Sequence, residues 1–316
     1  MDQSILSSRA VVGMYYARLE ANPGLAWVDG VSNLFNSDQE IETYPFLGQS
    51  AAMREWIGGR HAKGLSANQL TIANKEYENT LEIKIKDLRR DKTGQIQARV
   101  AEFVDSSLTH WASLLSTLII NAPSAVCYDG AYYFDTDHSE SNSGTQSNDI
   151  TVDISTLPTA VAGTVTAPSV EEMQQSILQG IAQILSFKNN EGEPMNENAS
   201  QFLVIVPVSL YLTAAAAVNA ASTAALQQNL NPNNLAGLNI SVQMNPRLTW
   251  TDSFAVFRTD SPIKGLIRQS EFDGGVKMLD ENSEYAFKNN AIQIGIDASR
   301  NVGYGLWQRA CYVTMV

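Results

Sequence analysis

Residues 95–121 carry the pattern that most constrains the fold of this chain. Apolar side chains recur there at spacings of three and four residues, which is typical of an amphipathic helix with one buried stripe, and Pro123 marks its end. At 1.5 Å per residue this helix is roughly 40 Å long, which exceeds the average helix of a globular protein. We therefore expect a structural spine. The stripe comprises Ile96, Val100, Phe103, Val104, Leu108, Trp111, Leu114, Leu115 and Leu118.

The residues before this helix have too little apolar sequence for a core of their own. Residues 1–43 contain separated apolar islands and are expected to form an N-terminal arm. In residues 44–90, four glycines precede two runs in which apolar and polar side chains alternate, around 70–72 and 81–86. With a reversal at 74–76, these runs predict an extended β-hairpin loop that is polar on one side.

A compact α/β unit is predicted after the spine. Ser169 and Glu172 have the capping-box spacing at the start of a helix. A continuous apolar strand at 202–206 follows, and then an Ala-rich helix and two further strand-like runs.

The domain boundaries follow from these elements. Because the C-terminal strands are expected to return to the spine unit, that unit is discontinuous. The predicted α+β chain has an arm (1–43), an extended loop (44–90), a spine-helix unit (91–164), an α/β unit (165–260) and a return to the spine-helix unit (261–316).

Charge is distributed unevenly along the chain, whose 33 acidic and 21 basic residues give a net charge of −12. Residues 101–246 contain 13 carboxylates and a single cation, Lys188, and account for the whole excess. Residues 54–92 instead hold nine basic and six acidic residues. A chain this acidic has no general attraction to nucleic acid or to anionic membranes. A basic segment and an acidic region in one sequence can, however, dock between copies.

Little in the sequence points to catalysis or to a bound cofactor. Cys127 and Cys311 are far apart and fit no disulfide framework or zinc motif, and a Cys127 nucleophile with His138 as its base has no supporting context. Asp135, Asp137 and His138 could bind a divalent ion, which leaves a metal-dependent hydrolase as an alternative. Successive residues of a strand point to opposite faces, however, and no second cluster supplies further ligands. We expect no metal, no cofactor and no membrane span.

Seven short segments, in order along nearly the whole chain, resemble the major head subunit of Mu-like phages and prophages. The Met-Arg-Glu-Trp and Asp-Thr-Asp-His strings are the most distinctive among them. The segments are Tyr-Pro-Phe-Leu-Gly (44–48), Met-Arg-Glu-Trp-Ile-Gly (53–58), Leu-Ser (65–66), Tyr-Glu (77–78), Cys-Tyr-Asp-Gly (127–130), Phe-Asp-Thr-Asp-His (134–138) and Gly-Tyr-Gly-Leu-Trp-Gln (303–308).

This resemblance implies a Hong Kong 97-type capsid fold, in which the spine unit is the peripheral domain and the α/β unit the axial domain. It implies a non-enzymatic major capsid protein that self-assembles as hexamers and pentamers into the icosahedral head around phage double-stranded DNA. The implied partners are a scaffold protein, a portal and, optionally, a decoration protein; the implied location is the virion, after assembly in the bacterial cytoplasm. Another ring-forming phage subunit, of a tail or connector, is the alternative.

Contacts between subunits are expected to involve the basic segment and apolar anchors of the arm and loop. In this hypothesis the basic segment of one copy lies across the acidic middle region of its neighbour. The candidate contact residues are Trp27, Phe35, Phe46, Arg54, Trp56, Arg60, Lys63, Lys84 and Lys86.

Overall fold

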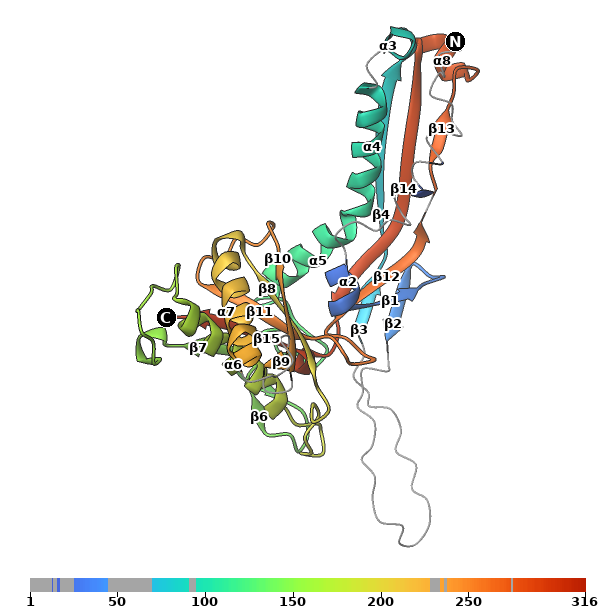
Figure 1. Ribbon diagram of the computed structural model, residues 1–316. Coiled ribbons are helices and arrows are strands. Elements are labelled where there is room, and N and C mark those ends of the chain that lie inside the picture. The colour runs from blue at the N-terminus through green and yellow to red at the C-terminus, as the bar shows by residue number, and fades with distance from the viewer. Residues whose placement is uncertain are drawn as a thin grey trace, which may run out of the picture.

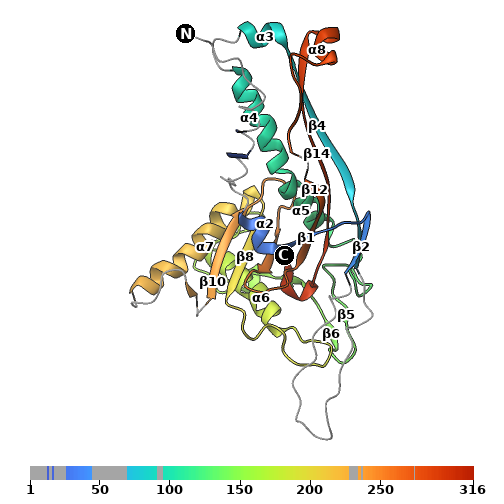
Figure 2. The same cartoon turned by 90° about the vertical axis from the view of Figure 1, so that its right-hand side faces the viewer.

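The computed structural model describes residues 13, 16–17, 26–44, 70–90, 95–227, 234–235, 238–273 and 275–316. Figures 1 and 2 show an elongated molecule in which a narrow blade projects from a wider body. We use "blade" for residues 75–108 and 275–300, and "body" for the described residues of 110–258 and 305–316. Each has its own hydrophobic core, and the two cores share no residue.

The sheet of the blade is organised around one long strand, β14 (Ala291–Tyr304). The strand β4 (Lys75–Lys84) pairs with it antiparallel along one edge. On the other edge, β13 (Lys277–Leu279) covers the first part of β14 and β12 (Leu266–Asp273) the second. The strand β1 (Ser32–Asn36) then adds to β12 in parallel.

The alternating residues of β4 and β14 build the core of the blade. Ile83 lies opposite Ile292, and both side chains are buried, as is Ile294 two residues further along β14. They pack in one cluster with Phe103 of the helix α4 (Gln95–Leu108), which covers this face of the sheet.

The predicted reversal at 74–76 is wrong. The strand β3 (Leu70–Ala73) pairs with β2 (Ile41–Tyr44), whereas β4 pairs with β14. The alternation around 81–86 correctly indicated a strand as far as Lys84, but Ile85 and Lys86 begin the helix α3 (Ile85–Arg90). Period alone does not identify the partner of a strand. Most of the predicted loop, residues 45–69, lies outside the described residues.

The predicted spine is present as two helical segments, α4 and α5 (His110–Asn121), which join at Thr109. The Thr109 hydroxyl donates to the carbonyl oxygen of Asp105 at 3.1 Å, a side-chain bond within the helix that favours bending. The Thr109 amide still donates to the same carbonyl at 3.0 Å, so the helical hydrogen bonding continues. The bend separates the two cores, because α4 packs in the blade and α5 in the body.

The body contains a six-stranded sheet in the order β7-β15-β11-β8-β10-β9. Its central strand β8 is buried over five of its six residues, as its continuous apolar run predicted. The strands are β7 (Asp149–Val152), β8 (Gln201–Val206), β9 (Asn234–Leu235), β10 (Leu238–Met244), β11 (Ser253–Arg258) and β15 (Ala310–Met315).

Two helices, α6 (Val170–Ser186) and α7 (Val208–Gln227), pack against each other and against this sheet. The capping box predicted at the start of α6 is confirmed: the Ser169 hydroxyl accepts from the Glu172 amide, and the Glu172 carboxylate accepts from the Ser169 amide. These bonds satisfy amides that the first helical turn leaves unpaired.

The last strand, β15, does not follow the prediction that residues 261–316 return to the spine-helix unit. After β14 the chain turns through the short 3-10 helix η3 (Trp307–Arg309), and β15 then enters the body sheet between β7 and β11. The body sheet therefore takes strands from three separate parts of the sequence, and the last residues do not complete the blade.

The remaining short elements connect these layers. None of the helices in the described part of the chain is long and apolar enough to span a membrane. The short elements are α2 (Ala26–Val31), α3 (Ile85–Arg90), α8 (Glu284–Asn289), η2 (Ile154–Thr156), β5 (His138–Ser139) and β6 (Thr145–Gln146).

The close packing of α6 on the sheet yields a test at Gly180. A Cβ atom there would lie 2.9 Å from Val313 Cγ2 and 3.1 Å from Val256 Cγ2. Gly180→Leu should therefore lower the free energy of unfolding by about 1–3 kcal/mol through overpacking, measured by urea unfolding of the unassembled subunit. Gln179→Leu, at the neighbouring exposed position, should change it by less than about 0.5 kcal/mol. Equal effects of the two variants would contradict this packing.

Candidate functional site: a buried histidine network and the charged surfaces

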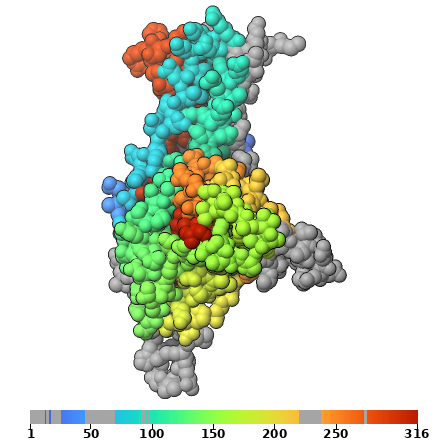
Figure 3. Space-filling model, turned by 90° about the vertical axis from the view of Figure 1, so that its left-hand side faces the viewer, coloured from blue at the N-terminus to red at the C-terminus, as the bar shows by residue number. Residues whose placement is uncertain are grey.

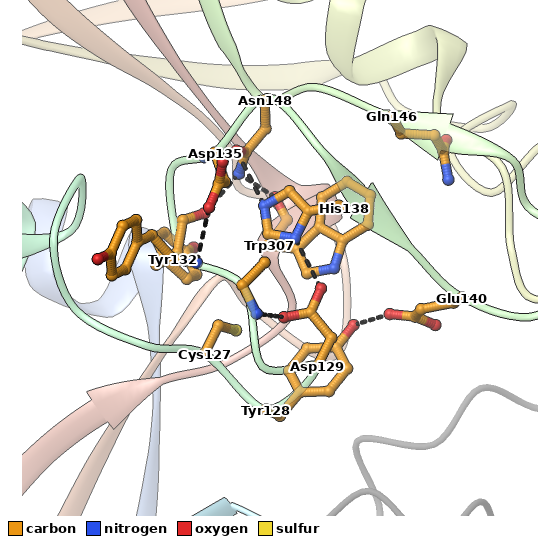
Figure 4. A network of polar contacts seen from close by, with 12 residues as sticks. Cys127, Tyr128, Asp129, Tyr132, Asp135, His138, Glu140, Gln146, Asn148 and Trp307 are labelled. Atoms are coloured by element: carbon orange, nitrogen blue, oxygen red, sulfur yellow. Dashed lines mark hydrogen bonds and ion pairs between the residues drawn. The ribbon is translucent and has the colours of Figure 1, made fainter.

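The first candidate site surrounds His138, whose side chain is fully buried in the body. Its Nδ1 atom lies 2.6 Å from Asp129 Oδ2, and its Nε2 atom lies 3.2 Å from Asn148 Oδ1 (Figure 4). The imidazole also stacks on the indole of Trp307, with ring centroids 4.0 Å apart and planes inclined by only 8°. The network therefore connects residues 129–148 to Trp307, which lies in the turn before β15.

The hydrogen bonds of Asn148 show which of its side-chain atoms faces His138. Asn148 Nδ2 donates to the Tyr133 carbonyl at 2.8 Å, and Asn148 Oδ1 accepts from the Asp135 amide at 2.9 Å. The atom facing His138 Nε2 is thus an acceptor, and the atom facing Nδ1 is a carboxylate oxygen. Both ring nitrogens of His138 therefore face oxygen atoms that can accept a hydrogen bond.

A second layer of hydrogen bonds adjoins this pair. Tyr128 Oη donates to Glu140 Oε1 at 2.5 Å, and Gln308 Nε2 donates to the same oxygen at 3.1 Å. Burial, and then the adjacent carboxylate of Glu140, raise the pKa of Tyr128 well above its ordinary value. The phenol therefore keeps its proton and acts as a donor.

The residues of the hydrolase alternative differ in their exposure and in their hydrogen-bond partners. The Asp135 carboxylate accepts from the amides of Tyr132 at 2.9 Å and Thr136 at 2.7 Å, whereas His138 points into the core and Asp137 is exposed. Burial raises the pKa of Asp135, but the hydrogen bonds from these two amides and with Asp137, together with the nearby His138, lower it, and the net shift is downward. Within the described residues, no group of three or more His, Cys, Asp or Glu side chains is placed to hold a metal ion.

The thiols do not form a nucleophilic site either. Cys127 and Cys311 are both buried and free. Cys127 Sγ lies 3.8 Å from the carbonyl oxygen of Gly305, and burial raises its pKa well above the ordinary value. A thiol in this state is a packing group, because the reactive species is the exposed thiolate.

The predicted contact residues fall into three groups. Trp27, 7% exposed, lies in the core of the body, and Phe35 is partly buried with its ring 5.4 Å from that of Tyr44. Lys84 and Lys86 are exposed on the blade. Contact of these residues with another subunit stays a prediction. The others, Phe46, Arg54, Trp56, Arg60 and Lys63, lie outside the described residues.

The acidic middle region, residues 101–246, has exposed carboxylates on several of its helices and loops. Lys188, its single cation, is also exposed. The exposed carboxylates are Glu102, Asp137, Asp153, Glu171, Glu193 and Glu197.

One surface residue was missed by the sequence reasoning. Phe287, on α8 at the tip of the blade, is 91% exposed, the highest value among the exposed large hydrophobic residues of the described chain. Its signal in the sequence is a phenylalanine, with Tyr285 as the other aromatic residue, within a strongly polar stretch, 280–290, where no apolar period explains it.

Comparison with known proteins places the chain in a family. The family model described as "Mu-like prophage major head subunit gpT" matches residues 15–158 and 236–315, well over half of the chain. The Mu-like prophage FluMu major head subunit of Haemophilus influenzae and the major capsid protein of Escherichia phage Mu are each 30% identical to it over 108 residues. This alignment covers 34% of the chain and 35% of each relative, so it spans about a third of the curated relatives' length.

Solved capsid structures share its fold. The procapsid subunit of bacteriophage JBD30 matches with a TM-score of 0.55 at 20% identity, over 99% of this chain and 76% of that one. The capsid subunit of cyanophage P-SCSP1u matches with a TM-score of 0.54 at 10% identity, over 90% of this chain and 86% of that one. The fold is thus the α+β, Hong Kong 97-type fold of phage capsid proteins, and the chain belongs to the Mu-like prophage major head subunit family.

Proposed function

We propose that this protein is the major capsid protein of a phage or prophage head and that it self-assembles, as hexamers and pentamers, into an icosahedral shell around double-stranded DNA. The observation that carries the proposal is family membership over most of the chain, together with a likeness of fold to a procapsid subunit that extends over 99% of it. Structural subunits of this kind do no chemistry, which agrees with the hydrogen-bonded burial of the His138 network.

The partners follow from the same proposal. A scaffold protein directs assembly, a portal occupies one vertex, and a decoration protein is an optional addition. Assembly takes place in the host cytoplasm, and the product is the virion. Residues 101–187 carry ten carboxylates and no Lys or Arg, so any part of them that faces the interior repels DNA phosphates and leaves the packaged genome free to slide.

Opposite charges on one chain supply an assembly force. The basic segment, residues 54–92, lies across the exposed carboxylates of the acidic middle region of a neighbouring copy. An exposed ion pair stabilises by only about 0.2–1 kcal/mol. Each contact recurs at every subunit boundary of a closed shell, so even weak pairs add up to a substantial total.

Electron microscopy of particles made by this chain, co-expressed with its neighbouring genes, tests the function. Closed icosahedral shells composed mainly of this chain are the expected result. Rings or tubes would favour the tail or connector alternative, and monomers under all conditions would contradict self-assembly.

Charge reversal tests the electrostatic part of the proposal. The triple variant Arg54→Glu, Arg60→Glu, Lys63→Glu should reduce the yield of shells about tenfold or more, because attraction at every copy of the contact becomes repulsion. Its circular dichroism and urea midpoint should remain those of the unchanged subunit. Lys188→Glu, which reverses a charge within the acidic region, is the matched control and should leave the yield unchanged. Normal yield from the triple variant would show that these cations are not needed for docking.

A structural role for His138 predicts a large loss of stability and no metal. His138→Gln removes the imidazole that contacts the buried Asp129 carboxylate and stacks on Trp307, and should lower the free energy of unfolding by about 3–5 kcal/mol. Asp129→Asn should act similarly, and the double variant should lose less than the sum of the two. Glu193→Gln, at an exposed site, should have little effect. An unchanged urea midpoint in His138→Gln, or stoichiometric metal in the purified protein, would contradict this role.

A further inference from the structure

Three cations cluster in the body, where the end of β11 meets the turn before β15. Arg258 ends β11, Arg309 ends η3, and Lys264 lies in the loop after β11. This loop packs on η3, because a Cβ atom at Gly265 would lie 3.6 Å from Arg309 Cβ. Arg258 and Arg309 are 3% and 9% exposed, and both donate to Asn196 Oδ1. Two buried guanidinium groups therefore share one neutral oxygen.

The cluster has fewer carboxylates than cations. Asp260 Oδ1 accepts from Arg258 Nε at 2.6 Å, and Asp260 Oδ2 accepts from the amide and the hydroxyl of Ser200 at 2.7 and 3.1 Å. Lys264 Nζ donates to a neutral main-chain carbonyl. Within the described part of the chain, neither Lys264 nor Arg309 forms an ion pair. One carboxylate thus faces three cations, and two positive charges have no counterion.

Arg309 has an incomplete set of hydrogen bonds. Its Nη1 atom donates to Asn196, whereas its Nε atom is buried and has no hydrogen-bond partner among the described residues. Burial, and then the charge of Arg258, lower the pKa of Arg309 to about 10, so the group still carries its charge at neutral pH. Ser261 Oγ, in the same loop as Lys264, is another buried atom without a partner. A buried cation without a counterion is costly and is typical of a group that an anion completes.

The cluster lies just below the surface of the body. Arg258 Nη2 donates at 2.7 Å to Asn198 Oδ1, and Asn198 is exposed. Lys264 is half-buried, and its flexible side chain can turn from its present carbonyl partner toward an anion. A DNA duplex or a folded protein does not reach guanidinium groups that are nine-tenths buried, whereas a small ion does.

We infer that this cluster is a binding site for a small tetrahedral dianion, of which inorganic phosphate is the biological example. A dianion neutralises both unpaired charges, whereas a carboxylate neutralises one. Guanidinium groups bind phosphate oxygens through paired N–H donors, and lysine binds them as a point charge. Arg309 and Lys264 contact the ion, and Arg258 adds its charge from the far side of Asn196. The inference concerns a single subunit and does not depend on the proposed shell.

The bound ion fixes the turn that leads into β15. Arg309 is the last residue of η3, and β15 starts at the next residue and enters the sheet between β7 and β11. In Figure 3, the end of the C-terminal strand shows as a small red patch enclosed by green and orange surfaces of the body. Phosphate therefore stabilises the folded subunit, because a ligand that binds only the folded chain favours it over the unfolded one.

Thermal unfolding of the unassembled subunit in low-millimolar phosphate tests the site. At an ionic strength held constant with sodium chloride, 10 mM phosphate should raise the midpoint by about 3 °C, as expected for a dissociation constant near 1 mM. The shift should saturate, whereas the general effect of phosphate on protein surfaces grows with its concentration. Isothermal titration calorimetry should give one phosphate per chain.

Substitutions assign the phosphate effect to the cluster. Arg309→Met should abolish the saturable shift, and Arg247→Met, at an exposed position of the body, should retain it. Arg309→Lys keeps the charge but loses the planar fork, and should retain less than half of the shift. This second variant provides the test if Arg309→Met does not fold.

Three outcomes would overturn the inference. No saturable shift in the unchanged chain, or a shift of the same size in Arg309→Met, would show that the cluster does not bind phosphate. An equal shift from 10 mM acetate would reassign the site to a carboxylate. Saturable stabilisation by duplex DNA at the same phosphate concentration would reassign it to a nucleic-acid backbone.

Discussion

The blade depends on the pairing of β14 with strands on both of its edges. At about 3.3 Å per residue its 14 residues span roughly 46 Å, and β4 pairs with it at ten consecutive positions. Among the described residues of the blade, α4 and α8 both pack on the sheet that this pairing forms. The two ends of β14 also belong to different cores, because Ile292 and Ile294 lie in that of the blade and Tyr304 in that of the body.

The His138 network has a comparable role in the body, where it joins segments that have no shared strand ladder. A buried polar contact is a poor source of net stability, because the desolvation of its groups offsets most of its attraction. It does restrict the geometry: the imidazole needs Asp129 and Asn148 in its plane and Trp307 beneath its face. We interpret the network as a device that places the turn before β15, and hence the C-terminal strand, in one register.

The sequence predicted those elements whose signal is local. The spine, the capping box of α6 and the buried strand β8 all follow from period, cap residues or a continuous apolar run. The partners of strands were not predictable in this way, because the alternation at 81–86 is the same whether β4 pairs with β3 or with β14. The C-terminal strand is apolar, and this pattern fits the sheet of the blade and the sheet of the body equally well.

The candidate sites likewise include features that a local pattern predicts and features that only the folded chain shows. Asp135, Asp137 and His138 are adjacent in sequence, but only the folded chain shows that His138 turns inward to Asp129 while Asp137 stays outside. Phe287 has no period or motif, and its importance comes from the absence of any described neighbour over its ring. The exposure of a single side chain leaves little trace in the pattern of a sequence.

The bend at Thr109 has a mechanical consequence. Helical hydrogen bonds continue through the bend: the Thr109 amide donates to the Asp105 carbonyl, and the Ser113 amide donates to the Thr109 carbonyl. The spine is therefore one bent helix. It lies between two cores that share no side chain. The strand β14 also passes from the core of the blade to the core of the body, so a change of angle between the two parts must bend this strand together with the spine. Because α5 and β14 contact each other, the blade and the body are joined through one packed helix and strand.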